Sequence, residues 1–188
     1  MKITRMMKVR FLWIGAVLLI VLPAFAQPPA APPGPGSELG QLSFFAGEWS
    51  CKGHVEATPF GPAHATQATV HLSKELGGFW YVGHYAEKKT AENPQPMSFE
   101  FVEGYAPAAK TFTLDGFDAF GNRSHQTSPG WKDGKLVYVG ESTGDGPATP
   151  ARDTFTKKGD AALEHMGEMQ IEGKWTAIDR ESCTRVKK

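Results

Sequence analysis

From residue 48 onward, most of the chain consists of short runs in which hydrophobic and polar residues alternate. The run WSCKGHVE at 49–56 alternates residue by residue, as do QATVHL at 67–72 and MSFEF at 97–101. Alternation with a period of two is typical of half-buried β-strands, because successive side chains point to opposite faces of a sheet. Since this part of the sequence shows no sustained helical period, the pattern predicts an all-β domain.

Turn-forming residues separate these runs and indicate how the strands are connected. Such turns occur at Gly77-Gly78, at residues 120–122 and at Asp133-Gly134, and the Asp-Gly pair favours a type I′ hairpin. About ten short strands result, and short connections favour antiparallel pairing of sequential strands. A long meander leaves two exposed edges unless it closes, so we predict a closed antiparallel up-and-down β-barrel of about ten strands.

The residues before the first strand predict a short N-terminal helix from Glu38 to Ala46. Ser37 is suited to cap this helix and Gly47 to end it. Three hydrophobic residues fall on one side of such a helix: Leu39, Leu42 and Phe45. We therefore expect the folded domain to span residues 38–188.

The first 37 residues are expected to lie outside the domain. Residues 1–26 combine four basic residues with an apolar run of 12 residues and a small-residue site before Gln27, which is the pattern of a secretory signal peptide. The apolar run is shorter than the ~20 residues that a membrane span needs, so we expect no membrane span in the mature protein. An uncleaved N-terminal anchor is the alternative. Residues 27–37 contain five prolines and are expected to form an extended linker.

The charge of the chain argues against nucleic-acid binding. The 188 residues include 20 basic and 20 acidic side chains, and removal of the four basic residues in the signal peptide leaves 16 against 20. A mildly acidic chain without basic clusters gives no electrostatic reason to bind nucleic acid. We expect a secreted, periplasmic protein.

The two cysteines provide a test of barrel closure. Cys51 lies on the first predicted strand and Cys183 on the last, and these strands are neighbours in a closed up-and-down barrel. A secreted chain meets an oxidising environment, so we expect a disulfide between them, with two free thiols as the alternative. The register that joins the cysteines also sets Arg185 opposite Trp49, where a guanidinium can stack on the indole ring.

The last strand carries two acidic residues on the face that holds Cys183. Asp179 and Glu181 fit poorly into an apolar barrel interior. Either a bulge turns this face outward, or the mouth of the cavity is polar.

Several blocks of the sequence resemble known families. GEW at 47–49, together with Arg185 near the end, is similar to the lipocalin and calycin signature, in which the tryptophan packs against a C-terminal arginine at the closed end of the barrel. The blocks LSFFAGEW, GGFWYVGHY and GWKDGKLVYVGE more closely resemble the secreted bacterial family of unknown function numbered 1579, over about residues 39–186. The resemblance implies a calycin-like barrel and no known activity.

The six histidines do not suggest a metal site. None forms a His-x-His pair, which would place two ligands on one face of a strand. His165 differs from the others, because it alternates with hydrophobic residues and Gly167. It is either a core histidine bonded to a neighbouring hydroxyl or carbonyl group, or a cavity residue that contacts a substrate or a haem iron. No haem motif matches, and we expect no cofactor and no metal. In a filled core we expect His165→Leu to be close to neutral or mildly stabilising. In a binding cavity we expect it to abolish binding and to leave the melting temperature nearly unchanged.

No recognisable catalytic motif appears in the sequence. It has no Gly-x-Ser-x-Gly elbow, no Cys-x-x-Cys pair and no dinucleotide loop. Carboxylates such as Asp115, Asp118, Glu168 and Glu181 are scattered, without a spacing that singles out an acid–base pair.

The leading hypothesis is therefore non-catalytic binding of a small apolar or amphipathic molecule in the barrel. An enzyme that acts through polar cavity residues such as His165 is one alternative, and an envelope interaction module with a filled barrel is another. A cavity of ~300 Å³ or more would separate binding or catalysis from a filled barrel. The residues expected to contact a ligand are His165, Tyr85, Phe99, Phe101, Tyr105, Tyr138 and Met169.

Overall fold

The computed structural model describes residues 34–187. The predicted signal peptide at 1–26, its cleavage site and most of the predicted linker at 27–37 lie outside the described residues. The elements are the 3₁₀ helices η1 (Ser37–Phe45) and η2 (Leu76–Gly78) and the strands β1 (Gly47–Val55), β2 (His64–Glu75), β3 (Trp80–Glu87), β4 (Ser98–Ala106), β5 (Thr111–Asp118), β6 (Arg123–Ser128), β7 (Trp131–Lys132), β8 (Lys135–Thr143), β9 (Thr149–Lys157), β10 (Ala162–Ile171) and β11 (Lys174–Arg185).

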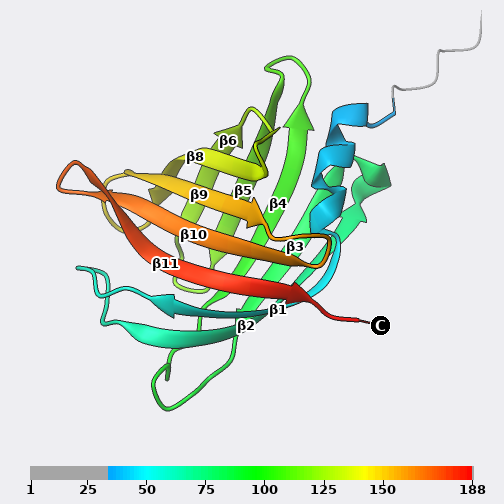
Figure 1. Cartoon of the computed structure of the whole chain (residues 1–188). Coiled ribbons are helices and arrows are strands. Elements are labelled where there is room, and N and C mark those ends of the chain that lie inside the picture. Colours follow the sequence, from blue (N-terminus) through cyan, green and yellow to red (C-terminus); the bar gives the residue numbers. More distant parts are fainter. Residues whose placement is uncertain (1–33, 188) are drawn as a thin grey trace, which may run out of the picture. The chain divides into compact units, whose positions relative to one another are not determined.

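Ten of these strands close into one antiparallel barrel (Figure 1). Their order around the barrel is β6-β5-β4-β3-β2-β1-β11-β10-β9-β8, and β6 pairs with β8 to complete the ring. The two-residue strand β7 pairs with β8 in a hairpin beside the ring. The predicted closed up-and-down barrel of about ten strands is confirmed.

The barrel closes where the sequence predicted, between its first and last long strands. In the β1–β11 register, Cys51 lies opposite Cys183 and Trp49 lies opposite Arg185. The two cysteines form the predicted disulfide. The Arg185 guanidinium lies 4.2 Å from the centroid of the Trp49 ring, which confirms the predicted stacking.

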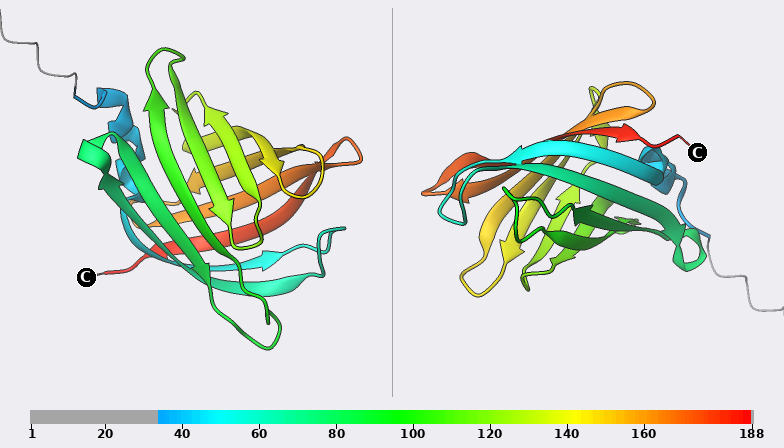
Figure 2. Two further views of the ribbon diagram at one scale, coloured as in Figure 1. Left: turned by 180° about the vertical axis from the view of Figure 1, so that it is seen from behind. Right: turned by 90° about the horizontal axis from the view of Figure 1, so that it is seen from below.

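The helix η1 lies at the end of the barrel where β1 begins and β11 ends, as both views in Figure 2 show. Arg185 donates hydrogen bonds to the backbone carbonyls of Phe44 and Ala46, and Trp49 donates its indole N–H to the carbonyl of Phe45 at 2.7 Å. The side of the helix that faces the barrel is buried through Leu39, Leu42 and Phe45. Packing and these bonds therefore hold the helix over this end.

The expected capping of this helix is wrong. The N-cap residue is Gly36, without a side-chain cap, and the Ser37 hydroxyl instead donates to Glu38 at 3.3 Å. The segment is a 3₁₀ helix, whose first backbone bond runs from Leu39 N–H to the Gly36 carbonyl at 3.2 Å. The turn therefore begins one residue earlier than expected, and Ser37 lies inside it.

The hairpin at Asp133-Gly134 has the predicted type I′ geometry. Its two central residues have φ values of 51° and 74°, as that turn requires. Glu172 and Gly173, between β10 and β11, have φ values of 52° and 77°. Both turns join adjacent strands with two residues, so they fix the strand register.

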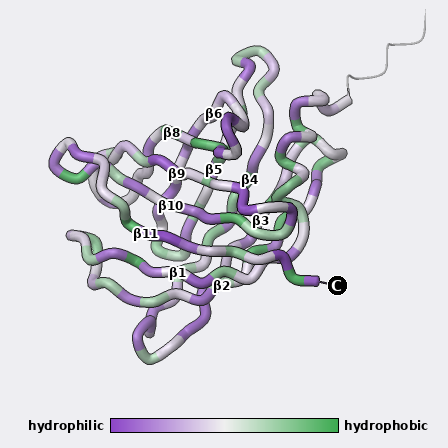
Figure 3. The backbone as a smooth tube through the Cα atoms, in the orientation of Figure 1, coloured by the Kyte–Doolittle hydropathy of each residue, from purple (hydrophilic) through white to green (hydrophobic). Residues whose placement is uncertain are grey.

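Hydrophilic and hydrophobic residues are interspersed along the strands (Figure 3), and the exposed alternate positions form the outer face of the barrel. Three histidines that the alternation placed on this face are exposed and pair with carboxylates of neighbouring strands: His71 with Glu48, His84 with Glu100 and His125 with Asp115. Across residues 34–187, the structure has no helix long and apolar enough to cross a membrane.

Candidate functional site

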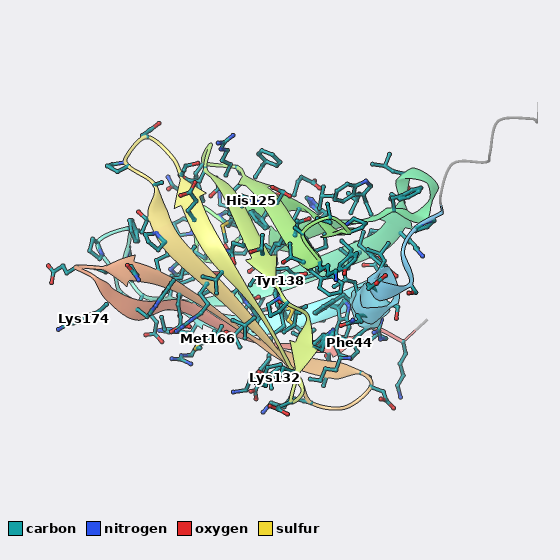
Figure 4. The ribbon with its side chains drawn as sticks, turned by 90° about the horizontal axis from the view of Figure 1, so that it is seen from above. Phe44, His125, Lys132, Tyr138, Met166 and Lys174 are labelled. Atoms are coloured by element: carbon teal, nitrogen blue, oxygen red, sulfur yellow. A yellow bond between two sulfur atoms is a disulfide. The ribbon has the colours of Figure 1, made fainter. Side chains whose placement is uncertain are left out.

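The barrel encloses a cavity of about 260 Å³. Phe45 and Trp49 line it at the end covered by η1, and Met97 and Asp118 line it at the opposite ends of the strands. Figure 4 shows the two ends, with Phe44 of η1 at one and Lys174 in the β10–β11 hairpin at the other. At ≈30 Å³ for each water molecule, the volume corresponds to roughly nine waters. The interior is therefore not filled by side chains.

Aromatic side chains form one wall of the cavity. Phe99 and Phe101, two of the residues expected to contact a ligand, both line it, and their rings stack with centroids 5.8 Å apart. A Cβ atom at Gly116 would collide with the Phe99 ring, and one at Gly83 would collide with the Phe101 ring. The two glycines therefore allow these rings to lie flat against the neighbouring strands.

His165 lies on the opposite wall between two aspartates. Its Nε2–H donates to Asp153 at 2.8 Å, and its Nδ1 lies 3.2 Å from Asp179. Burial alone would lower the pKa of His165, but the two carboxylates outweigh it and raise the pKa well above its usual value. The ring also stacks on Phe155, with centroids 4.8 Å apart. His165 is therefore an imidazolium that is held at both nitrogens.

This arrangement corrects two expectations about His165. Its partners are carboxylates rather than a hydroxyl or carbonyl group, and neither ring nitrogen is free to coordinate an iron or to accept a proton. Asp179 also takes the space over Gly167, because its Oδ2 would lie 2.5 Å from a Cβ at that glycine.

Glu181 and Tyr85 form a second polar pair on the cavity wall. The Tyr85 hydroxyl donates to Glu181 at 2.8 Å. Burial, followed by the nearby Glu181 charge, raises the pKa of Tyr85, and burial raises the pKa of Glu181. A Cβ at Gly53 would lie 2.6 Å from the Glu181 side chain, so this glycine makes room for the carboxylate.

The sequence left open whether Asp179 and Glu181 are turned outward by a bulge or make the cavity polar. Both residues line the cavity, so the wall is polar here. A register irregularity does occur, between Gly167 and Glu168 of β10, but it does not turn the two acidic residues outward.

Two buried polar residues of the cavity were missed from the sequence. Glu103 and Gln126 are each 2% exposed and line the cavity. Glu103 Oε2 and Gln126 Oε1 have no hydrogen-bond partner among the described residues. Burial raises the pKa of Glu103 to about 8. The alternation of Phe99, Phe101 and residue 103 was the signal that could have placed Glu103 inside.

Carboxylates that are scattered in the sequence meet in this cavity. Glu168 is 9% exposed and forms a bidentate pair with Arg152, with both N–O distances 2.7 Å. Among the described residues that line the cavity, His165 is the one basic side chain. Six acidic residues line it: Glu103, Asp118, Asp153, Glu168, Asp179 and Glu181.

The structure does not bring every predicted residue to the cavity. Met169 and Tyr85 line it, but Tyr105 and Tyr138 do not. Tyr105 packs on Phe112 at the helix-covered end, with ring centroids 5.0 Å apart. Tyr138 is completely buried and packs against Phe155, with ring centroids 6.3 Å apart.

The described residues contain one grouping with the composition of a metal site: Cys51, Glu181 and Cys183. Its two cysteines are joined as a disulfide, and disulfide sulfurs are not the thiolates that bind metals. These residues therefore do not fit a metal ion in this state.

Comparison with known proteins supports the fold and gives no evidence about the function. No family model matches the chain, and no curated protein matches it. Among solved structures, the chain is similar to Rv2717c from M. tuberculosis, with a TM-score of 0.65 and 12% sequence identity. The match covers 81% of this chain and 99% of that chain. At this identity the likeness shows a shared barrel and carries no activity across.

Proposed function

We propose that this protein is a non-catalytic binding protein for a small amphipathic molecule. The observation that carries the proposal is the cavity of about 260 Å³, which has an aromatic wall on one side and hydrogen-bonding groups on the other. Ligand pockets are mostly apolar with a few placed polar groups, and they commonly start at ~300 Å³. The volume therefore favours a ligand smaller than a typical drug molecule.

Two observations argue for binding over the alternatives. A barrel that served only as an interaction module would gain stability from a filled interior, since cavities cost packing energy. An enzyme that used His165 as a base would need a free ring nitrogen, and both nitrogens face aspartates. We also propose a secreted location, which the disulfide supports because such bonds persist in oxidising compartments.

Calorimetric titration with phenethyl alcohol tests the proposal. This probe joins one aromatic ring to one polar group and is small enough for the cavity. We expect saturable binding with one site for each chain. Val70→Phe should abolish it, because Val70 lines the cavity and a phenyl ring there would occupy the space.

The neighbouring residue supplies the matched control. Thr69 lies on the same strand and is exposed, so Thr69→Phe should leave binding unchanged. A second blocking variant, Ser124→Phe on β6, and circular dichroism spectra of all variants separate a filled cavity from a misfolded barrel. Equal binding by the wild type and both blocking variants would refute the proposal, as would no binding by the wild type.

A further inference from the structure

We propose that the cavity selects a small organic cation, a protonated amine on an apolar body, and that Glu103 accepts its ammonium hydrogen bonds. The inference rests on the proposed function, because it names the chemical class of ligand for the same cavity.

The first step is the balance of charge around the cavity. Six carboxyl groups line it, and His165 is the one basic side chain that does so among the described residues. Arg152 pairs with Glu168, and His165 is shared by Asp153 and Asp179. Within residues 34–187, no basic side chain pairs with the remaining acids that line the cavity.

The second step is the kind of polar atom that is left without a partner. Glu103 Oε2 and Gln126 Oε1 have no partner among the described residues, although both side chains are almost completely buried. The Gln126 amide donates its N–H to Asp153, so the unsatisfied atom is its carbonyl oxygen. The Gln126 oxygen is therefore an acceptor, and the Glu103 carboxyl becomes one when it ionises, which a nearby ammonium group favours. An ammonium group supplies three donors and no acceptor.

The third step is the aromatic wall, which lies beside Glu103 because Phe99 and Phe101 precede it on the inner face of β4. The stacked rings of Phe99 and Phe101 line the cavity together with Met97 and Leu114. Aromatic faces attract cations, and the wall also covers an apolar body. Leu114 lies opposite Glu103 in the β4–β5 register, so polar and apolar surfaces meet within one site. An anion would gain nothing from the unpaired acceptors and would be repelled by the carboxylates.

A matched set of probes tests the inference. Phenethylamine, phenethyl alcohol and phenylpropanoate share one aromatic ring and are cationic, neutral and anionic at pH 7. In calorimetric titrations of the full mature chain, we expect the amine to bind at least about tenfold more tightly than the alcohol, as befits hydrogen bonds to a charged group. The anion should bind most weakly.

The variant Glu103→Gln assigns the preference to one residue. It keeps the size of the side chain but cannot take up the negative charge that a bound ammonium group favours on Glu103, so the preference for the amine should fall below about threefold. Glu100→Gln is the matched control, because Glu100 lies on the same strand but on the exposed outer face. That variant should keep the full preference.

The outcomes separate this inference from the proposed function. If the alcohol or the anion binds the wild type as tightly as the amine, the cation inference is wrong and the binding function stands. If Glu103→Gln keeps the full preference, the assignment to Glu103 is wrong. If none of the three probes binds, the proposed function itself fails.

Discussion

At the scale of single residues, His165 is a structural imidazolium as well as a cavity residue. Its side chain is 17% exposed and lies between Asp153 and Asp179, which are 24% and 26% exposed. We expect His165→Leu to lower the free energy of unfolding by roughly 3 kcal/mol, because removal of one partner leaves uncompensated charges in a partly buried place. This replaces the expectation of a neutral substitution. Urea unfolding of both proteins at pH 6 measures the difference.

The pH dependence gives this prediction a sign. The folded pKa of His165 is raised above the ordinary value of 6.5, so its stabilisation is fully present below that pH and is lost as the pH rises through the folded value. The difference in free energy of unfolding between wild type and His165→Leu should therefore become smaller at alkaline pH. His125→Leu serves as control, since that exposed pair with Asp115 is worth within about 0.5 kcal/mol. The prediction would be wrong if His165→Leu lowered the free energy of unfolding no more than His125→Leu does.

Glu103 should also make the stability of the protein without ligand fall as the pH rises, because its folded pKa is raised as well. Burial raises its pKa from 4.5 to about 8, so between these values the unfolded chain has released a proton that the folded chain still holds. Wild-type stability should therefore fall relative to Glu103→Gln as the pH rises from about 5 to 8, by up to ~1.4 kcal/mol for each pH unit. Urea unfolding at four pH values measures this, and parallel curves for the two proteins would disprove it.

At the scale of secondary-structure elements, alternation predicted the strands and the turn residues predicted their connections. The same rule also placed Glu103 and Asp153 on inner faces, but hydrophobicity guided the choice of candidate residues, so these were passed over. The ion pairs of His165 join residues of three strands, β9, β10 and β11. Such contacts depend on how neighbouring strands curve in the barrel, and the alternation within a single strand does not predict them. Tyr105 and Tyr138 were expected at the cavity but do not line it. Alternation predicts which face a residue is on, whereas its depth along the barrel is set by the stagger of the strands.

The attachment of η1 to the barrel depends on Arg185. Its guanidinium donates to the carbonyls of Phe44 and Ala46 and covers the Trp49 ring. Lysine keeps the charge but loses the planar fork and the stacking, so Arg185→Lys should speed amide hydrogen exchange in residues 37–46 by about tenfold. Mass spectrometry of the peptic peptides measures this rate.

Another arginine of the same strand is the control for that experiment. Arg180 is 58% exposed and lies 3.8 Å from Glu56 on the outer surface. Arg180→Lys should leave exchange in residues 37–46 unchanged. Equal rates in wild type and Arg185→Lys would show that packing of Leu39 and Leu42 alone holds the helix.

At the scale of the whole molecule, two kinds of bond hold the first strand of the barrel, β1, to the last, β11. One is the backbone hydrogen bonding between the strands, and the other is the disulfide. Strands β1 and β11 pair along seven residues of β1, from Trp49 to Val55. The disulfide within this pairing links residues that are 132 positions apart in the chain. The two links act on different states, because the hydrogen bonds stabilise the folded barrel, whereas the disulfide mainly restricts the unfolded chain.

That difference predicts what loss of the disulfide does. The double variant Cys51→Ala with Cys183→Ala should keep the circular dichroism spectrum of the barrel, since the backbone pairing remains. Its free energy of unfolding should fall by up to about 5 kcal/mol, the size expected for a loop of this length. Wild type that is unfolded and refolded in urea with a reductant should give the same midpoint as the double variant, because both lack the same constraint. Equal midpoints for oxidised and reduced wild type would refute the prediction, and a double variant without β-structure would show that the covalent bond, rather than strand pairing, closes the barrel.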